Sequence, residues 1–450
     1  MLWLCILLPR FALEASIGEA PLASQAAQAA LETLALWALQ WSSQVSCRNA
    51  GTHADDGSGT GNGTSTGADN CTALWLEIGA SRQLFGQLYG QDGALRERIA
   101  AELTALGYSH HLGIALTPQS AALLARAGLS TVAHTRAQLQ QQLEPLPLTL
   151  LALPGEQIAA LQSAGLRCIG EILALPEASI AQRFGPGTSL YLRYLRGEAH
   201  QPQRCIKVPA RFDSRCEFAA AITSNTALLF PLQRLLSGLQ GYLRCRDRAV
   251  QRYTLCLEHH RRAPTRLQIS LTRPSSDATQ LLTLARERLA TTVLVAPVQG
   301  LKLEAHELLQ PLVLQSDLFS RAAQQSEQLQ QVIDRCAARL GAAAVQTLRG
   351  TTDHRPERAW QMVTAQVLAP GKTLTVMPST PTRPCWLLPE PQRIDKPQEL
   401  LAGPERIESG WWDGADVARD YYLVRDQRGA QLWVFHDLRS GGWHVHGVWA

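Results

Sequence analysis

The chain opens with MLWLCILLPR (Met1–Arg10), an apolar run that ends at Leu8 and is closed by Pro9 and Arg10. A secretory leader would start with basic residues and carry a longer apolar region. This stretch therefore predicts a buried β-strand over Leu2–Leu8, in the centre of a sheet. We also expect no membrane segment, because no stretch of the chain reaches the ~18 apolar residues of a spanning helix.

Alternating predicted strands and helices continue from this strand. They are a helix over Ser24–Gln40, strands from Val45 and over Ala73–Ile78, a helix over Gly93–Leu106, a strand over His111–Ala115 and a helix over Pro118–Ala127. This βαββαβα order predicts a mixed sheet packed by helices, over residues 1–145. Residues 48–70 are rich in Gly, Ser, Thr and Asp and almost lack apolar side chains, so we expect a disordered loop there.

Five further segments give the chain an α+β multidomain organisation. They are a helical domain (146–200), a βαββαβ domain (204–308), a linker (309–325), a helical segment containing DHRPERAW (326–376), and a module (377–450) in which a Pro-rich linker (377–391) leads to three or four antiparallel strands. In the helical domain, Gly165 and Gly170 are expected to end helices, and Pro176 to lie in the first turn of the next helix. In the βαββαβ domain, TLCLE and LQISL alternate apolar and polar residues, which predicts a sheet with one exposed face.

Positive charge is concentrated in the βαββαβ domain. The whole chain carries a net charge of only +4, whereas Arg204–Arg273 holds twelve Arg and one Lys against four acidic residues. A local basic block in a nearly neutral chain indicates a polyanion-binding surface, the alternative being a solvated face. The residues expected to track DNA phosphates on the exposed face are Arg244, Arg246, Arg248, Arg252, Arg261 and Arg262.

The cysteines and histidines indicate no metal site. Ten Cys are scattered without a Cys-x-x-Cys pair, which favours reduced thiols in a cytoplasmic protein. His444 and His446 share one face of a predicted strand, but no Cys or acid cluster accompanies them. We expect neither a bound metal nor a cofactor.

Aromatic residues crowd the last forty positions, in greater number than the core of so small a module needs. Aromatic side chains beside arginines are typical of protein interfaces. We predict that Trp411, Trp412, Tyr421 and Tyr422 bind a protein partner.

The order of these parts resembles that of Y-family translesion DNA polymerases, with a palm-like layer, a helix-hairpin-helix-like thumb and a basic little-finger-like domain. LEIGASRQLFG (Leu76–Gly86) and GIALTPQSAALLARAG (Gly113–Gly128) resemble the palm segments near the catalytic carboxylates. DHRPERAW, RPCWLLPEPQRI and GPERIESGWW resemble the ImuB subfamily, polymerase-like proteins of the bacterial mutasome. The resemblance covers nearly the whole chain.

The resemblance implies that the catalytic site is degenerate. Polymerases of this kind hold two Mg²⁺ ions with carboxylates. Here Cys5 and Leu7 stand at the ligand positions of the first strand, and Gln44 and Val45 at those of the second motif. Only about fifteen residues separate the first strand from the helix at Ser24, too few for a fingers domain. A palm without catalysis and without fingers is expected.

A short motif follows the basic domain, in LVLQSDLF (Leu312–Phe319). It fits the Gln-x-[Ser/Asp]-Leu-Phe pentapeptide by which bacterial polymerases bind the β sliding clamp. Leu and Phe would fill an apolar pocket while Gln fixes the register. The predicted clamp-binding residues are Gln315, Ser316, Asp317, Leu318 and Phe319, the alternative being that Leu318 and Phe319 cap the domain core.

Three functional hypotheses follow. The first is a non-catalytic adaptor in SOS-induced translesion synthesis that joins DNA, the clamp, an error-prone C-family polymerase subunit and a RecA-like accessory protein. The second is a divergent active polymerase that uses Asp55, Asp56 or Glu77. The third is a simple DNA-binding module without a role in replication.

Overall fold

The computed structural model describes residues 1–15, 24–48, 71–82, 92–311, 321–365, 383–384 and 386–449. These form two compact units, here called the N-terminal unit (Met1–Arg339) and the C-terminal unit (Leu340–Ala450). Most of the predicted disordered loop, residues 49–70, lies outside the described residues.

The first sheet of the N-terminal unit is built around the opening strand. Its strands are β1 (Trp3–Leu8), β2 (Val45–Arg48), β3 (Thr72–Glu77) and β4 (His111–Ala115), in the order β2-β3-β1-β4. All of its strand pairs are antiparallel, so the prediction of a mixed sheet was wrong. Among the described residues around this sheet, parallel pairing occurs in an isolated bridge between Ile114 and Val132. Apolar runs indicate which strands are buried, whereas strand direction depends on the connections.

Helices cover both faces of this sheet, which explains the unbroken apolar run of β1. Around the sheet lie α1 (Phe11–Glu14), α2 (Ser24–Ala38), α4 (Asp92–Ala105) and α5 (Pro118–Arg126). Leu4 and Ile6 belong to a core shared with α2 and α4. Cys5 and Leu7 point the other way and belong to a second core with α5.

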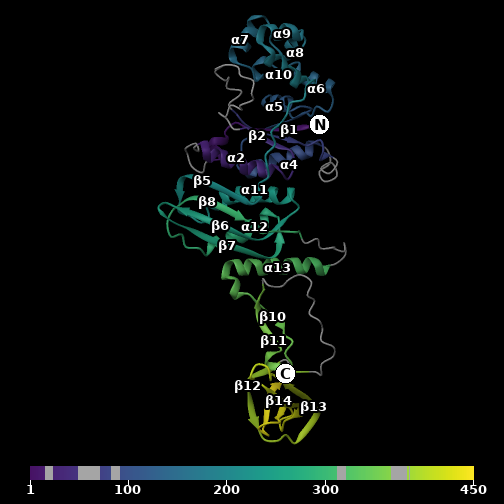
Figure 1. The fold of residues 1–450 in the computed structure, drawn as a ribbon, viewed down its shortest axis with the longest axis vertical. Coiled ribbons are helices and arrows are strands. Elements are labelled where there is room, and N and C mark those ends of the chain that lie inside the picture. The colour runs from purple at the N-terminus through teal and green to yellow at the C-terminus, as the bar shows by residue number, and fades with distance from the viewer. Residues whose placement is uncertain are drawn as a thin grey trace. The chain divides into compact units, whose positions relative to one another are not determined.

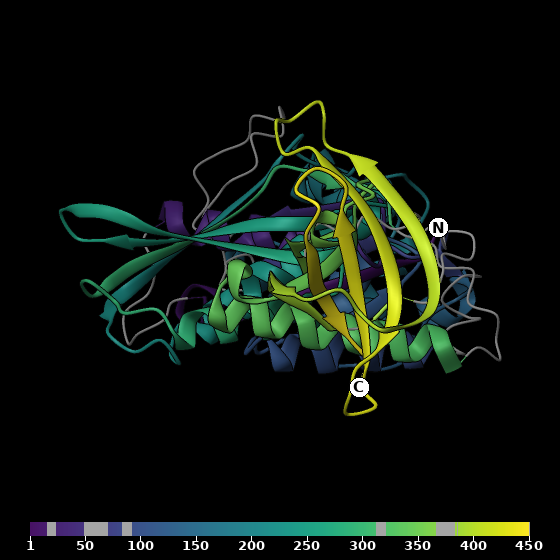
Figure 2. The same cartoon turned by 90° about the horizontal axis from the view of Figure 1, so that it is seen from below.

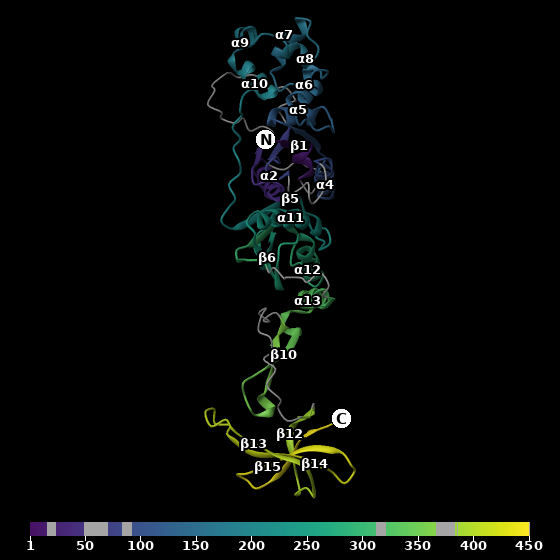
Figure 3. The same cartoon turned by 90° about the vertical axis from the view of Figure 1, so that its right-hand side faces the viewer.

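A helical domain continues this second core (Figure 3). It contains α6 (Arg136–Leu143), a 3₁₀ turn (Leu148–Leu150), α7 (Gly155–Ser163), α8 (Ile169–Leu173), α9 (Glu177–Phe184) and α10 (Pro186–Arg196). Gly165, at φ +90°, follows the end of α7 as predicted. Pro176 is the N-cap residue of α9, one position before the first turn in which it was predicted. Gly170 does not end a helix but lies inside α8, where an added Cβ would approach the Cα of Glu144 to 3.1 Å. Close packing, not a left-handed turn, accounts for this glycine.

The second sheet has the predicted βαββαβ order, with longer strands than the sequence indicated (Figure 1). Its elements are β5 (Phe212–Ile222), α11 (Leu229–Cys245), β6 (Ala249–His259), β7 (Arg262–Ser275), α12 (Ala278–Ala290), β8 (Val298–Ala305) and the short β9 (Leu308–Leu309). The strand order is β5-β8-β6-β7. Tyr253 on β6 donates a hydrogen bond to the carbonyl of Leu281 on α12 (2.6 Å), so this face of β6 is turned toward the helices. The opposite face of the sheet is open.

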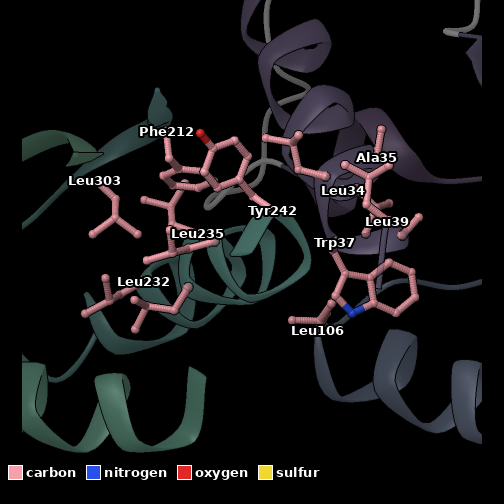
Figure 4. Packing of buried hydrophobic residues seen from close by; sticks show 14 of the residues in the cluster. Leu34, Ala35, Trp37, Leu39, Leu106, Phe212, Leu232, Leu235, Tyr242 and Leu303 are labelled. Atoms are coloured by element: carbon pink, nitrogen blue, oxygen red, sulfur yellow. The ribbon is translucent and has the colours of Figure 1, made fainter. Parts of the chain in front are cut away.

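The two sheets are joined through a single hydrophobic core at the contact between α2 and α11 (Figure 4). Trp37 and Leu34 of α2 lie in the same cluster as Leu235 and Tyr242 of α11. Gly241 of α11 is required for this approach, because an added Cβ would lie 2.1 Å from the carbonyl oxygen of Leu36. The segments 1–145 and 204–308, predicted as separate domains, therefore share one core.

A buried arginine reinforces the same contact. Arg234 of α11 donates hydrogen bonds to the carbonyls of Leu106 (2.8 Å) and Glu14 (2.7 Å). Its guanidinium also lies over the rings of Tyr108 and Phe230. Carbonyl acceptors and aromatic faces together compensate for the burial of this charge.

The long helix α13 (Arg321–Leu340) packs on the second sheet of the N-terminal unit. Asp334 accepts a hydrogen bond from the backbone amide of Thr272 on β7 (2.7 Å). The segment predicted as helical, 326–376, is a helix only up to Leu340. After Gly341, at φ +95°, the chain forms a hairpin of β10 (Gln346–Gly350) and β11 (Trp360–Thr364), with 3₁₀ turns at Ala342–Ala344 and Pro356–Arg358.

The C-terminal unit contains a five-stranded antiparallel sheet, one strand more than the largest number predicted (Figure 2). Its strands are β12 (Trp386–Ile394), β13 (Glu399–Ser409), β14 (Val417–Arg425), β15 (Gln431–Asp437) and β16 (Trp443–Val448), in the order β12-β16-β15-β14-β13. The predicted linker 377–391 is wrong from Trp386 onward, because β12 starts there. Pro389 and Pro391 are tolerated since β12 is an edge strand whose register shifts between Leu387 and Gln392.

Among the described residues, no helix combines the length and the apolar character needed to cross a membrane.

The glycine contact between α2 and α11 gives a test of the shared core. Gly241→Ala should lower the free energy of unfolding by about 1–3 kcal/mol, because the added methyl group meets backbone atoms that cannot turn aside. The control is Gly187→Ala in α10, where nothing lies within 4 Å of the added Cβ. Denaturant unfolding would contradict the shared core if the two variants were equally stable.

Candidate functional site

The degenerate positions of the first strand are closed off by α5. Cys5 lies opposite Gly113 on β4, and an added Cβ at Gly113 would come within 2.2 Å of the carbonyl oxygen of Ala121 on α5. Cys5 and Leu7 are buried in the apolar core beneath this helix. Burial raises the pKa of the Cys5 thiol to about 12, which disfavours the thiolate that would bind a metal.

The remaining positions of the degenerate site lie at the end of the same sheet. Val45 is buried, whereas Gln44 and Glu77 line a cleft of about 450 Å³ together with Arg82 and His134. The structure thus brings Gln44 and Glu77 together, but places Cys5 and Leu7 in a core on one face of the sheet. The alternative acids Asp55 and Asp56 lie outside the described residues.

Glu77 is held by the backbone and is almost completely buried. Its Oε1 accepts hydrogen bonds from the amides of Leu2 (3.2 Å) and Gly79 (3.0 Å), and its Oε2 from the amide of Ala80 (3.1 Å). These contacts tie the start of β1 to the turn that follows β3. The geometry is that of a structural carboxylate.

The open face of the second sheet is electrically balanced. Residues directly opposite one another on neighbouring strands share a face. By that register the face carries four basic and four acidic residues, namely Arg215, Arg252, Arg266, Lys302, Asp213, Glu217, Glu258 and Glu304. Many are paired: Arg215 lies 2.8 Å from Glu258, and Lys302 lies 2.6 Å from Glu304. This face is therefore not the uniformly positive surface that the count of arginines suggested.

The six predicted DNA-binding arginines lie in three places. Arg244, Arg246 and Arg248 follow one another at the end of α11, where Arg244 donates to the side chain of Gln40 (3.0 Å) and Arg246 to the carbonyl of Pro209 (2.6 Å). Arg252 is on the balanced sheet face, 3.8 Å from Glu307.

The last two lie where β6 passes into β7, with Arg261 in the turn and Arg262 as the first residue of β7. Both are exposed, and Arg261 has a φ of +53°. Arg262 also lines a polar cleft of about 600 Å³ beside β5, which includes Arg215, Glu217 and Glu258. The sequence-based prediction did not place these acids on the same face as the arginines, although Asp213, Arg215 and Glu217 alternate along β5 and were a usable signal.

The predicted aromatic surface of the C-terminal unit divides into buried and exposed parts. Tyr421 is buried, stacks on Trp433 at 4.2 Å between ring centroids, and hydrogen-bonds to His446 (2.8 Å). Its side chain thus builds the core and presents no surface to a partner, which corrects its predicted role. Tyr422 is half-buried, whereas Trp411 and Trp412 are 79% and 58% exposed.

The predicted clamp-binding residues Gln315, Ser316, Asp317, Leu318 and Phe319 all lie outside the described residues. Nothing in the geometry of the described chain bears on them.

Among solved structures, the chain is similar to DinB from Sulfolobus solfataricus (10% identity, TM-score 0.33) and to a Dbh ternary complex (11% identity, TM-score 0.32). Each alignment covers 69% of this chain and all of the solved chain. No family model matches the chain.

Among curated proteins, the chain is similar to Protein ImuB of Caulobacter vibrioides, represented by two strains. The identity is 26% over 455 residues, which cover 94% of this chain and 93% of that protein. This similarity confirms the resemblance to the ImuB subfamily found in the sequence, and it extends along almost the whole chain.

The geometry of Glu77 predicts a loss of stability on substitution, with no change in chemistry. Glu77→Gln should lower the free energy of unfolding by about 1.5–3 kcal/mol, because an amide group then faces a backbone donor. Glu97→Gln, on the exposed surface of α4, is the control. In primer extension with Mg²⁺ or Mn²⁺, wild type and variant should both incorporate nothing. Template-dependent incorporation that disappears in Glu77→Gln would instead support the divergent polymerase.

Proposed function

We propose that this protein is a catalytically inactive, Y-family polymerase-like adaptor in DNA-damage tolerance. The main support for this proposal is that the positions of the catalytic carboxylates are not available to a metal. Helix α5 covers Cys5 and Leu7, and the carboxylate of Glu77 accepts hydrogen bonds from three backbone amides. Two-metal nucleotidyl transfer needs several free carboxylates around an open site. Without that chemistry, the retained architecture serves to bind and connect.

The proposed partners follow from the chain's resemblance to the ImuB subfamily. The adaptor works in SOS-induced translesion synthesis and joins DNA and the β sliding clamp to an error-prone C-family polymerase subunit and a RecA-like accessory protein. Similarity to ImuB over 94% of this chain supports this assignment. The clamp is bound by Gln315–Phe319, and protein partners by Trp411 and Trp412 of the C-terminal unit.

DNA binding is proposed to centre on the turn between β6 and β7. On the sheet face the arginines already have acidic partners, so they offer little net charge to a phosphate. Arg261 and Arg262 project from the end of the hairpin, where the described contacts include a carbonyl (Val295, 3.2 Å) and no carboxylate within 4 Å. Contacts of this kind hold DNA without regard to sequence.

The salt dependence of DNA affinity tests this assignment. Arg261→Ala with Arg262→Ala should weaken binding equally on all sequences and reduce the slope of log K against log[salt] by about 1.4–1.8, because two phosphate contacts are lost. The control, Arg406→Ala with Arg425→Ala, removes the same charge from ion pairs of the C-terminal sheet. Equal slopes for the two double variants would contradict the proposed site.

The clamp motif is tested by binding and melting of one double variant. If Leu318 and Phe319 are clamp anchors, Leu318→Ala with Phe319→Ala should abolish binding to purified β clamp and leave the melting temperature and DNA affinity unchanged. Leu312→Ala with Val313→Ala, just upstream of the pentapeptide, is the control. A lowered melting temperature together with wild-type clamp affinity would assign Leu318 and Phe319 to the core instead.

A further inference from the structure

The turn between β13 and β14 exposes two adjacent tryptophans. It runs through GWWDGAD (Gly410–Asp416), with Gly410 and Gly414 at φ +89° and +72°. Trp411 and Trp412 meet edge to face, with 5.6 Å between their ring centroids. Apolar side chains of this size are seldom left in water without a function.

A buried arginine from another segment holds this turn. Arg355, in the DHRPERAW motif, is only 2% exposed. Its Nη1 and Nη2 bind the two carboxylate oxygens of Asp413, at 3.0 and 2.7 Å, and its Nε and Nη2 bind Asp353, at 3.0 and 2.6 Å. One guanidinium thus joins two carboxylates that are sixty positions apart in the sequence.

Further contacts fix the backbone of the turn. Arg355 Nη1 donates to the carbonyl of Ala415 (2.9 Å), and the amide of Ala415 donates to Asp413 (3.1 Å). The Arg355 guanidinium lies 5.8 Å from the centre of the Trp412 ring. Hydrogen bonds from Arg355 hold the pKa of the Asp413 carboxyl well below its usual range, so the arrangement stays charged at physiological pH.

The charges around the tryptophans are paired within the unit itself. Asp413 also binds Arg358, Glu357 pairs with Arg419, and Asp416 pairs with Arg439. Residues 341–450 hold twelve basic and twelve acidic side chains, in contrast to the basic block of the second sheet. The turn thus offers apolar surface in a neutral setting, which suits an apolar protein pocket and not a nucleic acid.

We propose that Trp411 and Trp412 form a preformed anchor for an apolar pocket of a protein partner, and that Arg355 is the positioning residue that keeps the anchor in shape. The proposal rests on the adaptor function and adds how the C-terminal unit recognises its partner. Two rigid indoles bury a large area with little loss of conformational freedom. Fixing their turn in advance removes part of the ordering cost of binding.

The test measures affinities of the full-length protein for two purified probes, the C-family polymerase subunit and the RecA-like accessory protein. Trp411→Ala with Trp412→Ala, and separately Arg355→Lys, should each weaken binding of one probe at least tenfold. Combining them should add little, because both remove the same anchor. Trp386→Ala, which removes a 68% exposed indole of β12, is the control and should change the affinity less than twofold.

Two further readouts separate positioning from general damage. Hydrogen exchange of residues 410–416 should accelerate in Arg355→Lys and in Asp413→Asn, while exchange in β14 and β15 stays as in wild type. Raising NaCl from 50 to 300 mM should change the affinity for the probe less than threefold, because no net charge takes part.

Each failure has its own meaning. Tryptophan variants that bind a probe as wild type does would overturn the anchor and leave the adaptor function intact. Unchanged exchange in Arg355→Lys would overturn the positioning role. A steep dependence of the affinity on salt would show that the partner offers a charged surface and not an apolar pocket. Wild-type protein that binds neither probe would contradict the adaptor function itself, and the anchor with it.

Discussion

The contact between α2 and α11 is the constraint on which the N-terminal unit depends. The sheet that contains β1 and the sheet that contains β6 each need a layer of helices on one face, and these two helices supply that layer to both at once. The contact is possible because Gly238 and Gly241 let the helices approach to backbone distance. The face of each sheet that points toward α2 and α11 is therefore buried in the shared core. In the second sheet this leaves the outer face and the hairpin turn between β6 and β7 open to solvent.

The distribution of charge follows from this arrangement. Arginines of the basic block that face the core are used structurally, as Arg234 is by the carbonyls of Leu106 and Glu14. Those on the open sheet face have acidic residues as cross-strand neighbours, as Arg215 has Glu258. The arginines at the ends of helices and strands are therefore the best placed in this block to attract DNA phosphates. A count of charges along a sequence therefore overstates the field of a folded surface when the acids lie on the same face.

The sequence predicted most elements of the N-terminal unit, because long apolar or alternating runs report burial directly. It did not predict the strand directions of the first sheet or the role of Gly170, since both depend on packing partners elsewhere. The edge strand β12 was taken for a linker because its prolines dominate the local pattern, and only a neighbouring strand shows where they are tolerated. At the candidate sites, Cys5 and Leu7 could be picked out because the resemblance to polymerases puts carboxylates at these two positions. The ion pair between Arg355 and Asp413 joins residues 58 positions apart, so no local sequence pattern could predict it.

The seating of α5 on β4 has an evolutionary consequence. At Gly113 the helix backbone lies so close to the strand that even a methyl group has no space. Placing carboxylates at positions 5 and 7 would therefore not by itself make a metal site. It would put two charges in the buried core beneath α5, closed to a nucleotide. If the chain is inactive as proposed, making an enzyme of this scaffold would require moving α5 as well as changing residues 5 and 7, so point substitutions alone would not suffice.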